Sequence, residues 1–272
     1  MSKLKKLFKG IGLLIRKPAL INHVIDDEEV WRKYVVKKFN IESLPVVTME
    51  HLFPGFSAHI PVFAFLDGGA LPTDIALLMK LAEKIDACKY FEIGTWRGES
   101  VANVARHAEE CYTLNLPDEK MRELGFPEKY IGLHAFFSKE IENVKHLKGD
   151  SRSFDYAALD KKFDLIFIDG DHHYEYVKND TQKVFEHFVH DNSIVVWHDY
   201  AKNPERIRQD VMAGIMDALP KKEHKYLYHI ENTLCAIYTK KQLTTKKAEF
   251  PEKPDHIFEI NLKINSYSKK NQ

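Results

Sequence analysis

Residues 163–174 of this 272-residue chain read Phe-Asp-Leu-Ile-Phe-Ile-Asp-Gly-Asp-His-His-Tyr. The first half is a short apolar run rich in β-branched and aromatic residues, which predicts a strand buried on both faces. Carboxylates and imidazoles follow directly, from Asp169 to His173. Because ligands of open parallel sheets bind just beyond the carboxyl ends of the strands, we expect a functional site at the end of this strand.

Similar apolar runs alternate with helical patterns over residues 71–240, and this alternation predicts right-handed crossovers in a doubly wound α/β sheet. The last two runs lie close enough in the chain to pair as an antiparallel hairpin. The seven strands are expected at 88–93, 110–116, a segment that ends near 148, 163–169, 193–197, 225–230 and 234–239.

Two further parts flank this predicted domain. Residues 1–70 are expected to form an extension, with a basic amphipathic helix over about 1–25 and then an irregular, proline-containing region that is either a lid or a structural collar. The helix either packs its apolar face on its own domain or on a second copy in a homodimer, or lies on an anionic membrane surface. Residues 241–272 are polar and rich in lysine, which predicts a loosely attached tail.

The composition argues against several classes of protein. Lysine plus arginine and aspartate plus glutamate number 40 each, so the chain lacks the positive charge typical of nucleic-acid-binding proteins. It contains no apolar run of about 18 residues, so no membrane span is expected. We predict a cytoplasmic protein, peripheral to the inner face of the membrane if the helix binds there. The cysteines form no CxxC pair and are expected to be reduced core residues: Cys88, Cys111 and Cys235.

The turn after the first predicted strand carries a second motif. Residues 91–100 read Phe-Glu-Ile-Gly-Thr-Trp-Arg-Gly-Glu-Ser. Glycines at such a turn permit positive φ and let a ligand approach the backbone closely. The segment lacks the G-x-G-x-x-G spacing of a pyrophosphate-binding site, and Glu92 directly before the loop suits a cationic ligand.

Three motifs together resemble class I S-adenosylmethionine-dependent methyltransferases: the E-I-G-T-x-x-G-x-S turn, the I-D-G-D-H-x-Y strand end, and W-H-D-Y at residues 197–200. The similar group carries the I-D-G-D-H-x-Y signature and is associated with modification of sugars and other small metabolites. The resemblance covers roughly residues 70–240. It implies a Rossmann-like, seven-stranded sheet of order 3-2-1-4-5-7-6, in which the last strand is antiparallel.

The resemblance also implies where the cofactor, S-adenosylmethionine, would bind. Glu92, Gly94 and Gly98 would line its methionine part, with Glu92 facing the amino group directly or through water. The cofactor-binding residues implied in this way are Glu92, Gly94, Thr95, Gly98, Asn115, Asp150, Ser151 and Asp169.

Two of these positions leave alternatives open. Where the family usually has an acidic residue for the ribose hydroxyls, this chain has Asn115, so Asp118 is the other candidate for that contact. Asp150 and Ser151 match the segment that normally meets the adenine ring, but Asp150 is equally suited to cap a helix or to stabilise a turn.

A metal site is expected where the fourth and fifth strands end. These strands are neighbours in the implied order, so Asp169 and Asp199 could converge on one cation such as Mg²⁺ or Mn²⁺. The neighbouring His198 would favour a transition metal. The sequence resembles metal-dependent O-methyltransferases, which usually have Asp-Asp or Asp-Asn after the fifth strand. The His198-Asp199 pair departs from that pattern.

The candidates for a general base follow the fourth strand. His172 stands where related metal-dependent enzymes carry a catalytic base, and histidine titrates near neutral pH. Asp171 is the second candidate. Alternatively, Asp171 caps the next helix while His172 or His173 packs against it. Tyr174 and Tyr200 either line an acceptor pocket or belong to the core, and the core interpretation is favoured.

These observations predict an S-adenosylmethionine-dependent methyltransferase that acts on a hydroxyl of a small molecule, such as a sugar or glycan precursor. One alternative is a non-catalytic or membrane-surface binding protein on the same fold. Another is an oxygenase with an iron site of two histidines and one carboxylate: His172 or His173, with His198 and Asp199. The alternating strand and helix pattern argues against the oxygenase, because such sites usually occur in β-barrels.

Overall fold

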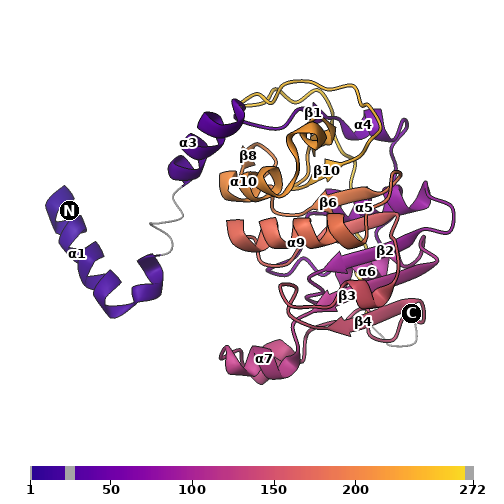
Figure 1. Ribbon diagram of the computed structural model, residues 1–272, viewed down its shortest axis with the longest axis horizontal. Helices are drawn as coiled ribbons and strands as arrows, with labels where there is room; N and C mark the ends of the chain where they lie inside the picture. Colours follow the sequence, from indigo (N-terminus) through magenta and orange to yellow (C-terminus); the bar gives the residue numbers. More distant parts are fainter. Residues whose placement is uncertain (1, 22–27, 267–272) are drawn as a thin grey trace. The chain divides into compact units, whose positions relative to one another are not determined.

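The computed structural model describes residues 2–21 and 28–266 (Figure 1). The chain divides into two compact units, Met1–Glu42 and Ser43–Gln272. Residues 1 and 22–27 of the predicted extension, and residues 267–272 of the predicted tail, lie outside the described residues.

The first unit contains the amphipathic helix that the sequence predicts. Helix α1 spans Lys3–Arg16 and begins after Ser2, whose hydroxyl oxygen accepts a hydrogen bond from the backbone N–H of Lys5. The 3₁₀ turn η1 (Pro18–Ile21) follows. Helix α3 (Glu28–Phe39) has two glutamates in its first turn and two lysines in its last, an order that complements the helix dipole. Among the described residues, no helix is long and apolar enough to cross a lipid bilayer.

An eight-stranded sheet forms the centre of the second unit. Its order is β1-β9-β10-β6-β5-β2-β3-β4, and all neighbouring strands are parallel except for the two pairs that include β10. The strands are β1 (Val46–Val47), β2 (Lys89–Ile93), β3 (Glu110–Asn115), β4 (Val144–Lys148), β5 (Leu165–Ile168), β6 (Ile194–Trp197), β9 (Leu227–Ile230) and β10 (Ala236–Tyr238).

The predicted order of seven strands and the antiparallel last strand are confirmed, but the predicted number of strands is wrong. The additional strand, β1, pairs in parallel with β9. The backbone N–H of His229 donates to the carbonyl of Pro45 at 2.9 Å, and on the other side Val46 and Lys246 exchange two backbone hydrogen bonds. Strand β1 forms because two distant segments pair with it. No alternating pattern in the sequence around it could therefore predict a strand.

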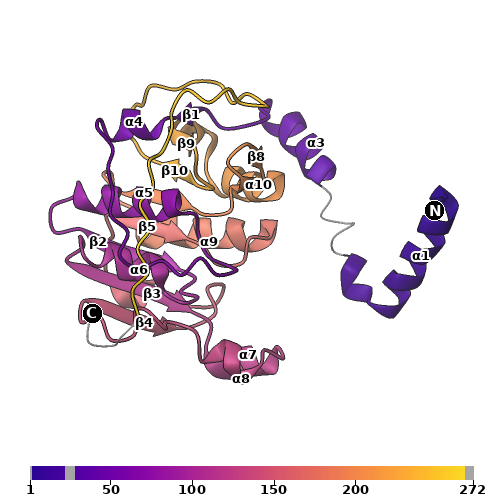
Figure 2. The ribbon, with the colours of Figure 1, turned by 180° about the vertical axis from the view of Figure 1, so that it is seen from behind.

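Helices cover both faces of the sheet. Helix α9 (Tyr174–His187) packs on α10 (Gln209–Ala218), and α5 (Pro72–Glu83) packs on α6 (Glu99–Val104). Figure 1 shows α9 and α10 in front of the sheet, and Figure 2, seen from behind, shows α5 and α6 in front. The shorter elements are α4 (Met49–Leu52), α7 (Asp118–Glu123), α8 (Glu128–Ile131), η2 (Ala157–Leu159), η3 (Lys221–Tyr226) and a separate hairpin of β7 (Ala201–Asn203) and β8 (Arg206–Ile207).

Strand β5 has the burial on both faces that its sequence predicts. Its residues Leu165–Ile168 are at most 4% exposed, because the sheet continues on both sides and helices cover both faces. It lies between β2 and β6, with all three strands parallel. The carboxyl ends of these three strands therefore lie side by side, and we call this side of the sheet the carboxyl edge.

Candidate active site

The carboxyl edge brings the predicted motifs together. The last residues of β2, β5 and β6 pair side by side in the sheet. The residues that follow them are Gly94, Asp169 and His198. Parallel pairing therefore places the predicted cofactor loop beside the predicted metal and base residues.

Both glycines of the predicted cofactor loop occupy positions that admit no other residue without rearrangement. Gly94 has a φ of 96°, and an added Cβ would lie 1.9 Å from the carbonyl oxygen of Asp169. Gly98 has a φ of 81°, and an added Cβ would lie 2.2 Å from Oγ of Ser138. Positive φ and close approach both require glycine, as the sequence motif suggests.

The loop also carries an aromatic stack that the sequence interpretation missed. Trp96 has a φ of 40° and stacks on Tyr130 with ring centres 4.5 Å apart, and Tyr130 stacks on Phe126 at 4.9 Å. The backbone N–H of Ala135 donates to the carbonyl of Trp96 at 2.7 Å. Phe126 precedes α8, which contains Tyr130, so no helical spacing in the sequence indicates this stack.

Glu92 belongs to β2, and its side chain lies between the sheet and α6. It is fully buried, and its carboxylate accepts hydrogen bonds from the hydroxyls of Tyr90 and Ser100, each at 2.8 Å, and of Thr113 at 2.7 Å. Burial raises the pKa of Glu92 to about 7, although the three hydroxyls oppose that shift. Thr95 bonds to Thr113, so the network runs from Glu92 to the loop.

The remaining predicted cofactor positions lie at the ends of β3 and β4. Asn115 donates its side-chain amide to the carbonyl of Leu116 at 3.1 Å, whereas Asp118 forms an ion pair with Lys148 at 2.7 Å. These two side chains thus have different local partners, and the predicted contact with a ribose stays a prediction.

Asp150 and Ser151 follow β4 and have local partners. The Asp150 carboxylate accepts from the backbone N–H of Arg152 at 3.0 Å and from its guanidinium, and that side-chain bond lowers the pKa of Asp150. The carbonyl of Ser151 accepts from the hydroxyl of Tyr156 at 3.0 Å. This arrangement fits the turn-forming alternative for Asp150. The predicted contact with adenine is not tested by it.

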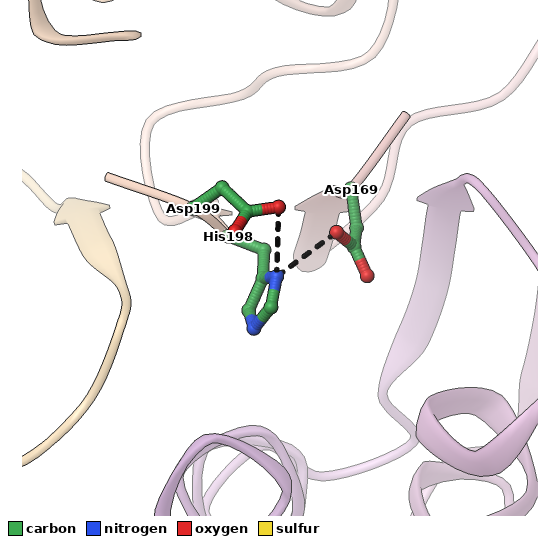
Figure 3. Close-up of side chains that lie close together, drawn as sticks. All are labelled: Asp169, His198 and Asp199. Atoms are coloured by element: carbon green, nitrogen blue, oxygen red, sulfur yellow. Dashed lines mark ion pairs between the residues drawn. The ribbon is translucent and has the colours of Figure 1, made fainter. Parts of the chain in front are cut away.

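The three predicted metal ligands converge on one point, as Figure 3 shows. Nδ1 of His198 lies 3.0 Å from Oδ1 of Asp169 and 3.3 Å from Oδ2 of Asp199, and one ligand atom from each of the three lies within 4.8 Å of the others. We call these residues the His198 cluster. Nδ1 is buried and makes no hydrogen bond of good geometry with either carboxylate. A buried nitrogen facing two carboxylate oxygens in this way is an arrangement that could hold a cation.

Asp74, which the sequence interpretation did not single out, fixes the other side of the His198 ring. Its Oδ2 lies 3.1 Å from Nε2 of His198, and Asp74 is fully buried. Its carboxylate also accepts from the backbone N–H of Leu71 at 2.7 Å and of Leu234 at 2.8 Å. The Asp74 carboxylate accepts a hydrogen bond from Nε2, so a neutral His198 ring carries its proton on Nε2. The lone pair of Nδ1 then faces the cluster.

The ionisable groups of the cluster change one another's pKa values. Burial disfavours a charged imidazole, but the carboxylates of Asp169, Asp199 and Asp74 outweigh it and raise the pKa of His198 well above its ordinary value. Burial raises the pKa of Asp169, whereas at Asp199 burial is outweighed by His198 and the pKa is lowered. The carboxylates around the ring therefore favour the protonated form of His198.

The two histidines after β5 have different surroundings. Nδ1 of His172 lies 3.5 Å from Oδ2 of Asp199, and its side chain is half exposed. Asp171 instead accepts from the backbone N–H of His173 at 2.9 Å and from its ring at 2.5 Å, just before α9 begins. His172 thus lies at the cluster, whereas Asp171 and His173 fit the helix-start alternative.

The two tyrosines that follow these motifs have partners within the fold. The hydroxyl of Tyr174 donates to Asp217 at 2.8 Å. Tyr200 is fully buried, and its hydroxyl oxygen accepts from the backbone N–H of Leu44 at 3.0 Å. Tyr200 therefore fits the core interpretation that the sequence favours, whereas Tyr174 is only partly buried.

A family model described as a methyltransferase domain matches residues 91–200. The matched segment begins within β2 and ends at Tyr200, so it includes the cofactor loop, the end of β5 and the His198 cluster. In a search of curated proteins, no match was found.

Solved structures match this chain at low sequence identity and with TM-scores below 0.5. The S-adenosylhomocysteine-bound methyltransferase PaMTH1 of Podospora anserina is 18% identical, with a TM-score of 0.42 over 62% of this chain and 78% of that chain. CalS11, a TDP-rhamnose 3'-O-methyltransferase of calicheamicin biosynthesis, is 13% identical, with 0.44 over 62% and 79%. Cofactor-bound Rv0187 from MTB is 19% identical, with 0.44 over 65% and 84%.

Proposed function

We propose that this chain is an S-adenosylmethionine-dependent methyltransferase that methylates a hydroxyl group of a small molecule. The observation that carries the proposal is the match of residues 91–200 to a methyltransferase domain. That segment contains all three sequence motifs, and the parallel sheet brings them to the carboxyl edge. A saccharide is the proposed acceptor class, and this finer part rests on the I-D-G-D-H-x-Y motif.

The chemistry of the loop fits this cofactor. S-adenosylmethionine carries two positive groups, a sulfonium and an amine, and the loop lies between the carboxyl groups of Glu92, which is buried, and Asp169, which is partly exposed. Gly94 brings the backbone of the loop against that of Asp169. A loop without side chains at Gly94 and Gly98 lets a ligand approach the backbone closely.

The donor set of the His198 cluster fits a divalent cation. Two carboxylates and one imidazole nitrogen would hold it, and the nitrogen favours Mn²⁺ or another transition metal over Mg²⁺. Asp74 would keep the His198 ring oriented for this purpose. A bound cation would lower the pKa of an acceptor hydroxyl.

The chain's own residues suggest how the transfer proceeds. When bound, S-adenosylmethionine would supply a methyl group to the acceptor oxygen, and the electron pair of the broken carbon–sulfur bond would stay on S-adenosylhomocysteine as it leaves. His172 is the proposed base that takes the hydroxyl proton, because it is half exposed beside Asp199. Asp171 is the weaker candidate, since His173 already holds its carboxylate. Among the described residues, no observation favours a non-catalytic role or the oxygenase alternative.

Calorimetric titration with S-adenosylhomocysteine tests the proposal without knowledge of the acceptor. We expect binding in the micromolar range by the full chain, with and without Mn²⁺. A chain that is folded by circular dichroism but binds neither S-adenosylhomocysteine nor S-adenosylmethionine under either condition would overturn the proposed function.

A further inference from the structure

Helix α1 carries an apolar stripe along one side. At 3.6 residues per turn, six of its residues lie within an arc of about 120°. Five of them are strongly exposed: Leu4 at 63%, Leu7 at 58%, Phe8 at 66%, Ile11 at 45% and Ile15 at 75%. Leu14, the sixth, is partly exposed. Exposed apolar side chains are common singly, but a continuous stripe of this kind indicates a binding surface.

The surroundings of the helix are open within the described residues of its own unit. A Cβ added to Gly10 or to Gly12 would meet no atom within 4 Å. These glycines lie on opposite sides of the stripe, because two residues turn the chain by about 200°. The described part of the first unit therefore leaves both flanks of the helix free.

The charged residues of the helix lie outside the stripe and are all cationic. Six lysine and arginine residues and no carboxylate precede Asp26, although the whole chain is electrically neutral. The positive charge is therefore concentrated beside the apolar stripe. The cationic residues are Lys3, Lys5, Lys6, Lys9, Arg16 and Lys17.

This charge distribution disfavours a second copy of the helix as the covering partner. Helices that pair through an apolar seam are stabilised by opposite charges beside the seam. In two copies of α1 the flanking charges would all be positive, because this segment has no acidic residue. A partner with an apolar interior beneath a negatively charged surface would complement both the apolar stripe and the cationic residues of the helix.

We propose that α1 binds the surface of a lipid bilayer that contains anionic lipids. The stripe is inserted among the acyl chains near the headgroups, and the lysines contact the lipid phosphates. The helix is too short and too polar to span a bilayer, so it lies in the plane of the surface. This inference does not depend on methyl transfer, and it places the proposed enzyme at a membrane.

Sedimentation of the full chain with lipid vesicles tests this proposal. We expect co-sedimentation with vesicles of equal parts phosphatidylcholine and phosphatidylglycerol, and little with phosphatidylcholine alone. Lys5→Gln and Lys9→Gln together should weaken binding about fivefold per lost charge. Leu7→Gln with Phe8→Gln should abolish it, because these substitutions remove apolar side chains and leave every lysine in place.

The matched control changes two apolar residues that are equally exposed in the second unit. Phe65→Gln with Leu66→Gln should leave vesicle binding unchanged, since these residues are 67% and 58% exposed but lack a cationic helix. Equal binding to both vesicle types, or binding that survives Leu7→Gln with Phe8→Gln, would overturn the proposal. So would a dimer in sedimentation equilibrium that those two changes dissociate, if the chain binds no vesicles. S-adenosylhomocysteine affinity should be the same in all variants, which separates this proposal from the proposed function.

Discussion

His172 and His173 are adjacent in the chain, but their contacts separate them. The ring of His172 is near Asp199 at the carboxyl edge, whereas the ring and backbone of His173 are both bound by Asp171. Only His172 therefore combines access to solvent with a position at the His198 cluster. The difference between the two residues provides a test with a built-in control.

We expect His172→Gln to lower kcat by about 10²- to 10⁴-fold, the usual contribution of a general base. The affinity for S-adenosylhomocysteine should not change, because the ring of His172 faces Asp199 after β6 and is not part of the cofactor loop after β2. Turnover is measured as S-adenosylhomocysteine release with a saccharide, selected from a panel, that supports activity of the unaltered chain. His173→Gln is the control and should keep kcat within a few-fold. Full activity in His172→Gln would remove His172 from the mechanism.

Asp74 provides a second test at the level of single residues. Asp74→Asn keeps the volume but weakens the acceptor on Nε2 of His198, and loss of such a contact typically lowers metal affinity by about 10- to 100-fold. Calorimetric titration with Mn²⁺ measures this loss, while S-adenosylhomocysteine binding reports that the fold is intact. Asp191→Asn, which affects an exposed ion pair with Lys240, should change neither. Unchanged Mn²⁺ affinity in Asp74→Asn would show that Asp74 does not orient His198.

The contrast between Asp169 and Asp74 shows how far the sequence predicts the site. Asp169 and Asp199 follow strands that are neighbours in the predicted order, so their convergence could be predicted. Asp74 lies 124 residues from His198, and it reaches the ring because α5 begins at Pro72 and turns Asp74 inward. The start of a helix is the least certain feature of a sequence pattern, and the contact depends on it.

At the level of elements, the end of β2 depends on glycine for two separable reasons. Gly94 has a positive φ and also lies against the backbone of Asp169, whereas Gly125, with a φ of 85°, has no atom within 4 Å of an added Cβ. Gly125→Ala should therefore cost only about 1 to 2 kcal/mol of unfolding free energy, from the left-handed conformation.

Gly94→Ala should cost more than Gly125→Ala, because the added carbon would force β2 and β5 apart. We expect a loss of about 3 kcal/mol or more in urea unfolding, together with loss of S-adenosylhomocysteine binding. Equal losses in the two variants would mean that the loop can move away from Asp169. In that case the close approach of the two strand ends would not shape the cofactor site.

The elements differ in how well they could be predicted. Strand β5 is a short buried run within a regular alternation, so local sequence defines it. Strand β1 has two residues in an irregular region and exists because β9 and Lys246 flank it. The stack of Trp96 on Tyr130 likewise joins the loop after β2 to helix α8, and no periodicity connects the two. Patterns in the sequence thus predict elements that are stabilised by their own burial, and they miss those that a distant segment forms.

For the second unit as a whole, the C-terminal segment secures one end of the sheet. The sequence predicts a loose tail after residue 240, but Lys246 pairs with Val46 through the backbone and with Glu231 through its side chain. Lys246 also lies 2.7 Å from Glu252. The start of the tail is anchored because Glu231, 4% exposed, provides a carboxylate for the lysine.

This anchor predicts that Lys246 stabilises the second unit more than an ordinary surface lysine does. Lys246→Met should lower the unfolding free energy by about 2 kcal/mol, because it leaves Glu231 buried without its cation. Lys240→Met is the matched control: its partner Asp191 is 90% exposed, so a loss of less than about 1 kcal/mol is expected. Urea unfolding at neutral pH measures both. Equal, small losses would mean that Glu231 finds other partners and that the segment after residue 240 does not hold the edge of the sheet.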